Sequence, residues 1–202
     1  MQSVKINELR PTQMTHGLRE IHQKTTEYQS LSGHTLDMAI AEKPIPVVIG
    51  PNAASFAIDH HHVATALWRA GIKAVPTVLV ADLSSLAQDE FWLTLENHRW
   101  TYPYDVKGRR VSFTAMPEHV WELADDEYRS LAASVRDAGG YEKTTVPLEE
   151  FRWADLFRSN LPYPTSDAEF ESLVKKAVKL AKSTVAIGLP GYVGPAEQKR
   201  QE

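Results

Sequence analysis

The residues best suited to chemistry stand together as Asp59-His60-His61-His62. The residues before this run favour a short strand and those after it favour a helix, so the run falls at a strand-to-helix junction. Such a junction points backbone N–H groups and the positive end of the helix dipole outward, where anions such as phosphate bind. Asp59 is placed to cap the helix, and the histidines add side-chain donors. We therefore predict that His61 and His62 bind a phosphate here, and that Asp59, His60 and His61 are the catalytic candidates.

Two other roles for this run need weighing. A histidine at the start of a helix is often structural, serving packing or capping. Metal binding is the second, because Asp59 and His61 would share one face of an extended segment. The paired spacing of histidines that marks metal-binding helices does not accompany them. We therefore predict no resident metal, and the cofactor stays unknown, with Mg²⁺ bound to a nucleotide as the one we consider.

Two further groups of polar and aromatic residues could complete such a site. A segment that follows Pro11 and leads into a helix carries side chains able to line a phosphate pocket. These are Gln13, Thr15 and Arg19. A later segment offers a guanidinium and aromatic rings on which a base or sugar could stack. Its residues are Arg99, Trp100 and Tyr102.

The elements that must position these residues are short strands and helices. Alternation and apolar runs predict strands over 3–10, 46–49, 55–58 and 75–81. Helical spacing predicts helices over 17–29, 63–70 and 84–100, then over 120–135, 149–158 and onward from Ser166, where Ser166 and Glu169 form a capping box. This order predicts an α+β protein with a helical C-terminal half. We expect one domain over 1–110, a helical extension over 111–187 packed on it, and a flexible tail over 188–202.

Composition excludes several classes of function. The chain has 202 residues, a net charge of −4 and no cysteine, so disulfides, zinc ribbons, iron–sulfur clusters and thiol nucleophiles are excluded. No apolar run approaches the roughly 18 residues of a membrane span, and the start does not resemble a signal peptide, so we expect a cytoplasmic protein without membrane contact. Acidic and basic residues balance over 1–110, and the excess negative charge lies after that point. Nucleic acid is therefore a possible partner that the charge does not favour.

Five stretches together resemble the ParB-like nuclease family, a branch of the ParB/sulfiredoxin superfamily. They are LRPTQMTHGLREI (9–21), IDHHHVATALWRAG (58–71), VPTVLVADLSSL (75–86), FW (91–92) and WTYPYDVKGR (100–109). The likeness continues less specifically through FRWADLFR (151–158). As a set these motifs are fairly specific to the family, although no single one is.

The resemblance implies a small mixed sheet with helices, in which a box at the strand-to-helix junction grips a nucleotide or phosphate. Asp59, His61 and His62 match that box, whereas His60 stands where many relatives have glycine and Val63 where they have arginine. The reducing chemistry of sulfiredoxin needs a cysteine and is excluded. Some members of the superfamily phosphorylate free serine with a glutamate base in the first motif.

The first motif here holds Thr12 and Gln13, neither of which is a strong base, and Glu20 follows one or two helical turns later. That argues against a serine kinase. The best hypothesis is a nucleotide-binding ParB-like enzyme that transfers a phosphoryl group or hydrolyses a phosphodiester, as a nuclease-like hydrolase would. The alternatives are a non-catalytic nucleotide-binding regulatory module and, less favoured, a DNA-binding partition-type protein.

Overall fold

The computed structural model describes residues 2–195 and divides into two compact units. The boundary falls between Asp126 and Glu127. Among the described residues, no helix combines the length and apolar character needed to cross a bilayer. The two units are described one at a time.

The first unit is built on a mixed sheet of five strands in the order β1-β6-β4-β5-β2. Neighbours pair antiparallel between β1 and β6 and between β4 and β5, and parallel between β6 and β4 and between β5 and β2. A separate parallel pair joins β3 and β7. The strands are β1 (Gln2–Lys5), β2 (Leu9–Arg10), β3 (Thr15–His16), β4 (Ile45–Ile49), β5 (Ser55–Ala57), β6 (Ala74–Asp82) and β7 (Ala124–Asp125).

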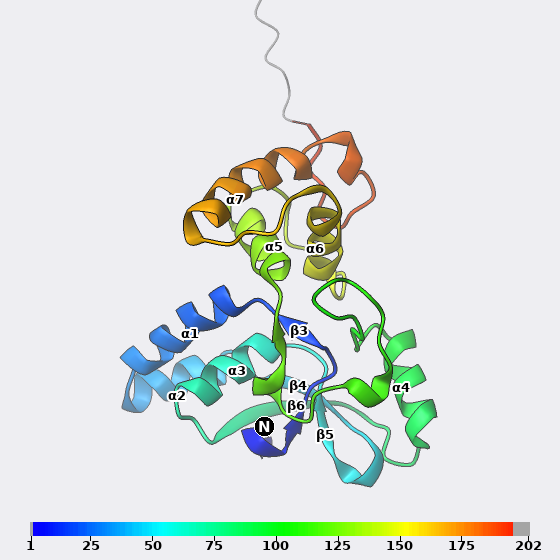
Figure 1. Cartoon of the computed structure of the whole chain (residues 1–202). Coiled ribbons are helices and arrows are strands. Elements are labelled where there is room, and N and C mark those ends of the chain that lie inside the picture. The colour runs from blue at the N-terminus through cyan, green and yellow to red at the C-terminus, as the bar shows by residue number, and fades with distance from the viewer. Residues whose placement is uncertain (1, 196–202) are drawn as a thin grey trace, which may run out of the picture. The chain divides into compact units, whose positions relative to one another are not determined.

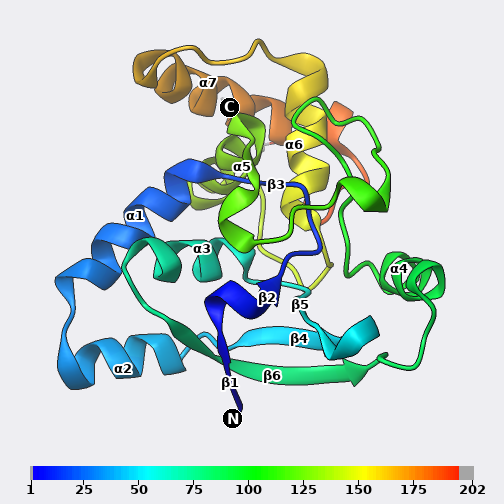
Figure 2. The same cartoon turned by 60° about the horizontal axis from the view of Figure 1, so that its bottom comes forward.

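Four α-helices and several short 3₁₀ turns complete this unit. Figures 1 and 2 show α1, α2 and α3 grouped on one side of it and α4 on the other. The helices are α1 (Leu18–Ser30), α2 (Gly33–Ala41), α3 (His61–Arg69) and α4 (Gln88–Asn97). The 3₁₀ turns are η1 (Ile6–Glu8), η2 (Pro51–Ala53), η3 (Phe113–Ala115) and η4 (Val120–Glu122).

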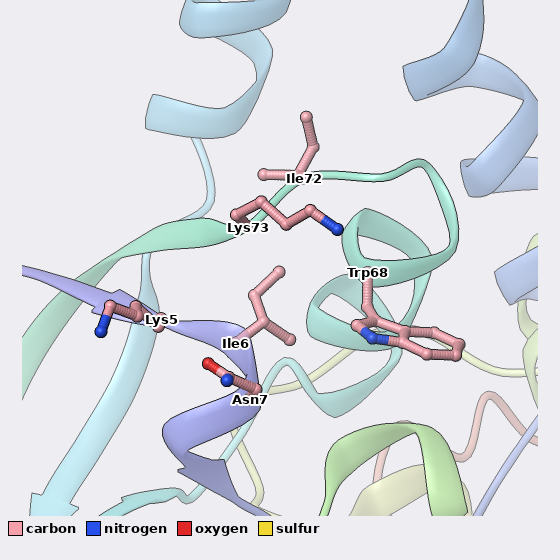
Figure 3. A pocket seen from close by; sticks show the side chains of 6 residues that line it. All are labelled: Lys5, Ile6, Asn7, Trp68, Ile72 and Lys73. Atoms are coloured by element: carbon pink, nitrogen blue, oxygen red, sulfur yellow. The ribbon is translucent and has the colours of Figure 1, made fainter.

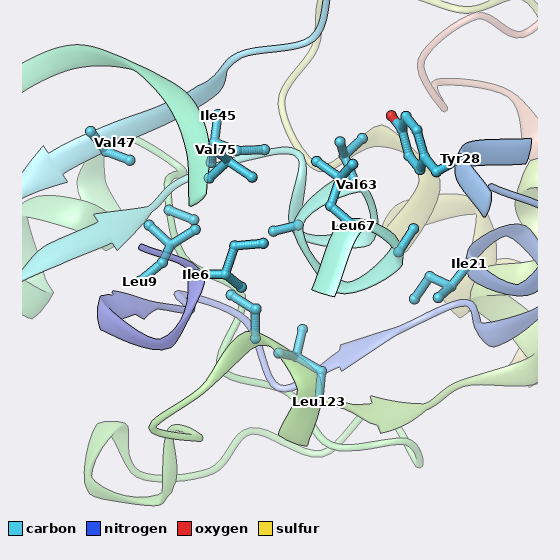
Figure 4. Close-up of a cluster of buried hydrophobic side chains, with 14 residues drawn as sticks. Ile6, Leu9, Ile21, Tyr28, Ile45, Val47, Val63, Leu67, Val75 and Leu123 are labelled. Carbon is cyan, nitrogen blue, oxygen red and sulfur yellow. The ribbon is translucent and has the colours of Figure 1, made fainter. Parts of the chain in front are cut away.

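The central strand β4 contributes side chains to the core on both faces of the sheet. Successive side chains of a strand point to opposite faces, so Val47 enters the cluster beneath α1 and α3 while Val48 enters the cluster beneath α4. The first cluster, drawn in Figure 4, joins the sheet to α3 through Val63 and Leu67 and to α1 through Ile21. These contacts fix the start of α3, where the histidine run lies.

The second unit packs three helices around its own apolar core. Trp153 and Phe157 of one helix meet Leu131 and Phe170 of the others. The side chain of Ser166 accepts the N–H of Glu169, as the capping box predicts. The helices are α5 (Glu127–Asp137), α6 (Glu149–Asn160) and α7 (Asp167–Ala181), followed by the 3₁₀ turn η5 (Thr184–Ala186).

The predicted α+β class and the helical C-terminal half are confirmed, and two elements differ from their predictions. The strand predicted over 3–10 is split into β1 and β2 by the turn η1, because Ile6 is buried and its N–H bonds the Lys73 carbonyl oxygen at 2.9 Å. The helix predicted over 120–135 begins only at Glu127. Ala124 before it pairs with β3 instead. The exposed helix α2 was not foreseen, since none of its residues is buried.

The boundaries also differ from those predicted. Residues 111–126 belong to the first unit, because Val120 and Leu123 lie in its core. Residues 188–192 do not form a loose tail. The Pro190 carbonyl accepts the Trp153 indole N–H at 2.9 Å, and the Gly191 carbonyl accepts the Glu142 N–H at 2.9 Å. Residues 196–202 of the predicted tail lie outside the described residues, and packing of the helical half on the first domain stays a prediction.

The stability of the second unit should depend on the buried stripe of α7. Leu173 is 3% exposed, so Leu173→Ala should lower the free energy of unfolding by roughly 2–4 kcal/mol, as for other buried leucines. Lys176→Ala, at an exposed position of the same helix, is the control and should leave it almost unchanged. Urea unfolding of the three proteins measures this. Equal stabilities would show that α7 contributes little to the core.

Candidate functional site

The histidine run lies where the sequence predicts it, between β5 and α3. His60 is the residue that flanks the helix, and its backbone is left-handed with φ of 58°. The Asp59 carboxylate accepts the His60 N–H at 2.6 Å, and no side chain caps α3. The prediction that Asp59 caps this helix is therefore wrong: the carboxylate holds the turn one residue before it. The helix consequently keeps its positive end open to an anion.

His61 faces the interior of the protein. Only 3% of it is exposed, and its Nε2 accepts the backbone N–H of Thr12 at 3.0 Å. Nε2 therefore carries no proton, and the neutral ring holds its proton on Nδ1. His61 is predicted from the sequence to have both a catalytic and a phosphate-binding role. The structure gives it a buried partner instead, which removes its ring from reach of a ligand.

Electrostatics keep this buried ring neutral. Burial is the main cause that lowers the pKa of His61 to about 3. The charge of Asp59 opposes this shift by raising the pKa, while His62 and His16 lower it further. His61 is thus an acceptor at neutral pH, which its bond from Thr12 requires.

His60 and His62 lie on either side of His61 and are partly exposed. The His60 Nδ1 lies 3.0 Å from the Pro44 carbonyl oxygen, to which it donates. The His62 Nε2 lies 3.5 Å from Glu20 Oε1, and the two side chains are 24% and 22% exposed. This contact places the first turn of α1 beside the first turn of α3. It also gives the site an imidazole paired with a carboxylate, both open to a ligand.

The predicted residues of the first motif divide between surface and interior. Gln13 is partly exposed, and its Nε2 donates to the Thr15 carbonyl oxygen at 2.8 Å. Thr15 is only 1% exposed, so the expectation that its hydroxyl binds phosphate does not fit its position. Arg19 is partly exposed in the first turn of α1, next to Glu20.

The N-terminus of α1 differs from that of α3 because a carboxylate already occupies it. Asp125 Oδ1 accepts the Leu18 N–H at 2.9 Å, and the adjoining strands β7 and β3 hold the two residues in place. The negative charge offsets the positive end of α1. Of the two helix ends, α3 is therefore the better anion site.

The predicted stacking residues are positioned differently from one another. Tyr102 joins the first motif through its backbone, since its N–H donates to the Thr12 carbonyl oxygen at 2.9 Å. One face of Trp100 is covered by the His98 ring, with centroids 4.3 Å apart. Arg99 is exposed on the turn after α4, where its backbone is left-handed with φ of 58°.

The geometry of the acidic and histidine side chains bears on metal binding. Within residues 2–195, no group of three or more histidine, aspartate or glutamate side chains is arranged to hold a metal ion. Asp59 and Glu20 are the carboxylates beside the open end of α3.

Comparison with known proteins assigns the chain to a family. The family model described as "Putative ParB-like nuclease" matches residues 2–159. The chain belongs to this ParB-like family. No curated protein matches it.

Two solved structures are similar to this ParB-like chain to different degrees. Protein Atu1540 from Agrobacterium tumefaciens is 37% identical with a TM-score of 0.89, and the match covers 96% of this chain and 97% of that one. The chromosome-partitioning protein ParB from Caulobacter crescentus, complexed to the centromeric parS site, is 15% identical with a TM-score of 0.32 over 92% and 94% of the two chains. Nothing about DNA is carried from the second protein to this one.

Glu20 of this ParB-like protein lies closer to the histidine run than its place in the sequence suggests. Its distance along the chain argued against a role as base, yet the first turn of α1 carries it to 3.5 Å from His62. The sequence does indicate the orientation of Glu20 on the helix. Glu20 and Lys24 at i and i+4 lie on one face, and Ile21 lies on the buried face next to it. The partner across the fold could not be read from that pattern.

The buried neutral state of His61 predicts a loss of stability in acid. Between pH 6.5 and pH 3 the unfolded chain binds a proton at His61 and the folded chain does not, so stability falls as the pH falls, by up to ~1.4 kcal/mol per pH unit. His61→Gln keeps an acceptor for Thr12 without a titratable group, so its free energy of unfolding should depend less on pH in this window.

Urea unfolding at pH 7, 6 and 5 measures the effect. His34→Gln, at an exposed position of α2, should keep the pH dependence of the wild type. Equal slopes in wild type and His61→Gln would mean that His61 titrates normally in the folded protein.

Proposed function

We propose that this ParB-like protein binds a nucleotide by its phosphates at the N-terminal end of α3 and transfers or hydrolyses a phosphoryl group there. The observation that carries the proposal is the open end of α3, where the helix lacks a side-chain cap and His60 and His62 flank the backbone donors. Phosphate is a natural ligand of such a helix end, because N–H groups and the helix dipole both favour negative charge.

Five residues are predicted to bind phosphate, and His61 leaves this set because it is buried. His62 keeps this role, since it is partly exposed at the first turn of α3. Arg19 and Gln13 are partly exposed on the adjoining segment and would complete the wall. Arg19 supplies the positive charge that the neutral His61 cannot. Thr15 would act only by supporting Gln13 through its carbonyl oxygen.

The Glu20–His62 pair supplies the chemistry of the proposal. A carboxylate beside an imidazole can accept the proton of an attacking hydroxyl while the ring is held in orientation. The oxygen of water or of a substrate hydroxyl would attack phosphorus, the bond from phosphorus to the leaving group would break, and the proton would pass to Glu20. Magnesium bound with the nucleotide would neutralise phosphate charge. Asp59 would act by holding His60 in its left-handed turn rather than by touching the substrate.

A binding-only role has a specific observation in its favour. Asp59 holds a backbone N–H, His60 donates to a carbonyl and His61 accepts from Thr12, so three of the four residues in the run serve the fold. A regulatory module that senses a nucleotide would need no more than His62 and the helix end. Turnover is the measurement that separates this candidate from the enzyme.

Nucleotide binding should depend on His62. His62→Gln removes the charge-assisted contact to phosphate, so affinity for ATP, ADP or CTP should fall about tenfold or more. Calorimetry with and without Mg²⁺ measures it, and His34→Gln is the matched control. Unchanged affinity in His62→Gln, or no binding of any nucleotide to the wild type, would refute the phosphate site.

The catalytic part of the proposal is tested at Glu20. Glu20→Gln keeps the size of the side chain and removes the base, so product formation should fall about a hundredfold or more while nucleotide affinity stays within a few fold. Product is followed by phosphorus NMR. Water and a panel of free hydroxy-amino acids serve as acceptors of the phosphoryl group, and a dinucleotide serves as a phosphodiester substrate. Saturable binding without product in the wild type would favour the regulatory module.

A further inference from the structure

A cavity lies near the C-terminal end of α3, at the opposite end of this helix from the histidine run. Its volume is about 240 Å³, and it lies between the turn after β1, the last turns of α3 and the chain that leads into β6 (Figure 3). Its lining is mostly apolar with a basic rim. The lining residues are Lys5, Ile6, Asn7, Trp68, Ile72 and Lys73.

The indole of Trp68 forms one wall and is held in place by other rings. It stacks on Trp121 with ring centroids 4.7 Å apart and an interplanar angle of 13°, and Trp121 stacks in turn on His119 at 4.3 Å. Even so, 41% of Trp68 is exposed. A large planar ring that is held rigidly but left open to solvent is a ready surface for a second flat ring.

The charge of the cavity comes from Lys73. Figure 3 shows its ammonium group pointing toward Trp68. The ammonium of Lys5 contacts the Glu8 carboxylate at 3.0 Å, so its charge is partly offset. Ile6 and Ile72 provide apolar surface between the two lysines. A ligand here meets an apolar floor, an aromatic wall and one available cation.

We propose that this cavity binds a small planar aromatic anion, with its ring against Trp68 and its anionic group at Lys73. The volume is below the roughly 300 Å³ at which pockets for drug-sized ligands begin, which limits the ligand to one ring or two fused rings. A bare inorganic anion would leave the apolar floor uncovered, and a neutral ring would leave Lys73 without a partner. None of these residues belongs to the proposed phosphate site, so the two sites are independent.

The probe for this site is indole-3-acetate, compared with the neutral indole-3-ethanol and with acetate. At the lower end of ligand efficiency, its 13 non-hydrogen atoms give a Kd of about 1 mM for the wild type. Indole-3-ethanol should bind about two- to fivefold more weakly, as expected for one exposed charge pair, and acetate should not bind detectably. Titrations followed by protein-observed NMR cover this range.

Three variants assign the binding to this cavity. Lys73→Gln should remove the difference between indole-3-acetate and indole-3-ethanol, while Lys43→Gln, an exposed lysine elsewhere in the first unit, should keep it. Trp68→Leu should weaken both ligands about fivefold or more. Its melting temperature is measured alongside, and the exposed Lys73→Gln keeps the test decisive if Trp68→Leu fails to fold.

Two results would overturn the proposal. One is equal affinity for indole-3-acetate in wild type, Trp68→Leu and Lys73→Gln. The other is no detectable binding to the wild type at ligand concentrations up to 10-fold above the expected Kd. His62→Gln should bind indole-3-acetate like the wild type. Loss of nucleotide binding in that variant with indole-3-acetate binding retained therefore tests the phosphate site separately.

Discussion

The first unit depends on the bonds that meet at Thr12. Its N–H donates to the buried ring of His61 at 3.0 Å, and its hydroxyl donates to the Ala57 carbonyl at 2.8 Å. Its own carbonyl accepts the Thr101 hydroxyl at 2.7 Å and the Tyr102 N–H at 2.9 Å. One residue thus ties together the end of β2, the end of β5, the start of α3 and the segment after α4. The three bonds that involve a side chain are buried, so loss of one partner would leave a polar group unsatisfied at a cost of roughly 1–3 kcal/mol.

This anchor decides which histidines are available for chemistry. Successive residues of an α-helix are turned by about 100° around its axis, so His62 points in a different direction from His61. Because His61 turns toward Thr12, His62 points toward α1 and meets Glu20, and His60 turns to the Pro44 carbonyl. The central histidine thus has a structural role, while the other two stay partly exposed.

The sequence predicts local elements well and long-range partners poorly, for a physical reason. The cap at Ser166, the strand β6 and the junction at 58–61 depend on neighbours in the chain, and all three were predicted. Three identical side chains in a row carry no signal of which one is buried, because that choice is made by Thr12, 49 residues away. Likewise, residues 120–126 have helical spacing, but pairing with β3 overrides it.

The surroundings of Val63 explain how this chain can lack the arginine that the family resemblance implies for many relatives at this position. Val63 is only 1% exposed and packs in the core beneath α1 and α3, so a guanidinium there would be buried without a partner. His60 has a left-handed backbone, a conformation that glycine adopts without strain, and this agrees with the glycine that the family resemblance implies for many relatives at this position. At the proposed phosphate site a cation would therefore have to come from another element, and Arg19 in the first turn of α1 is the residue we propose for it.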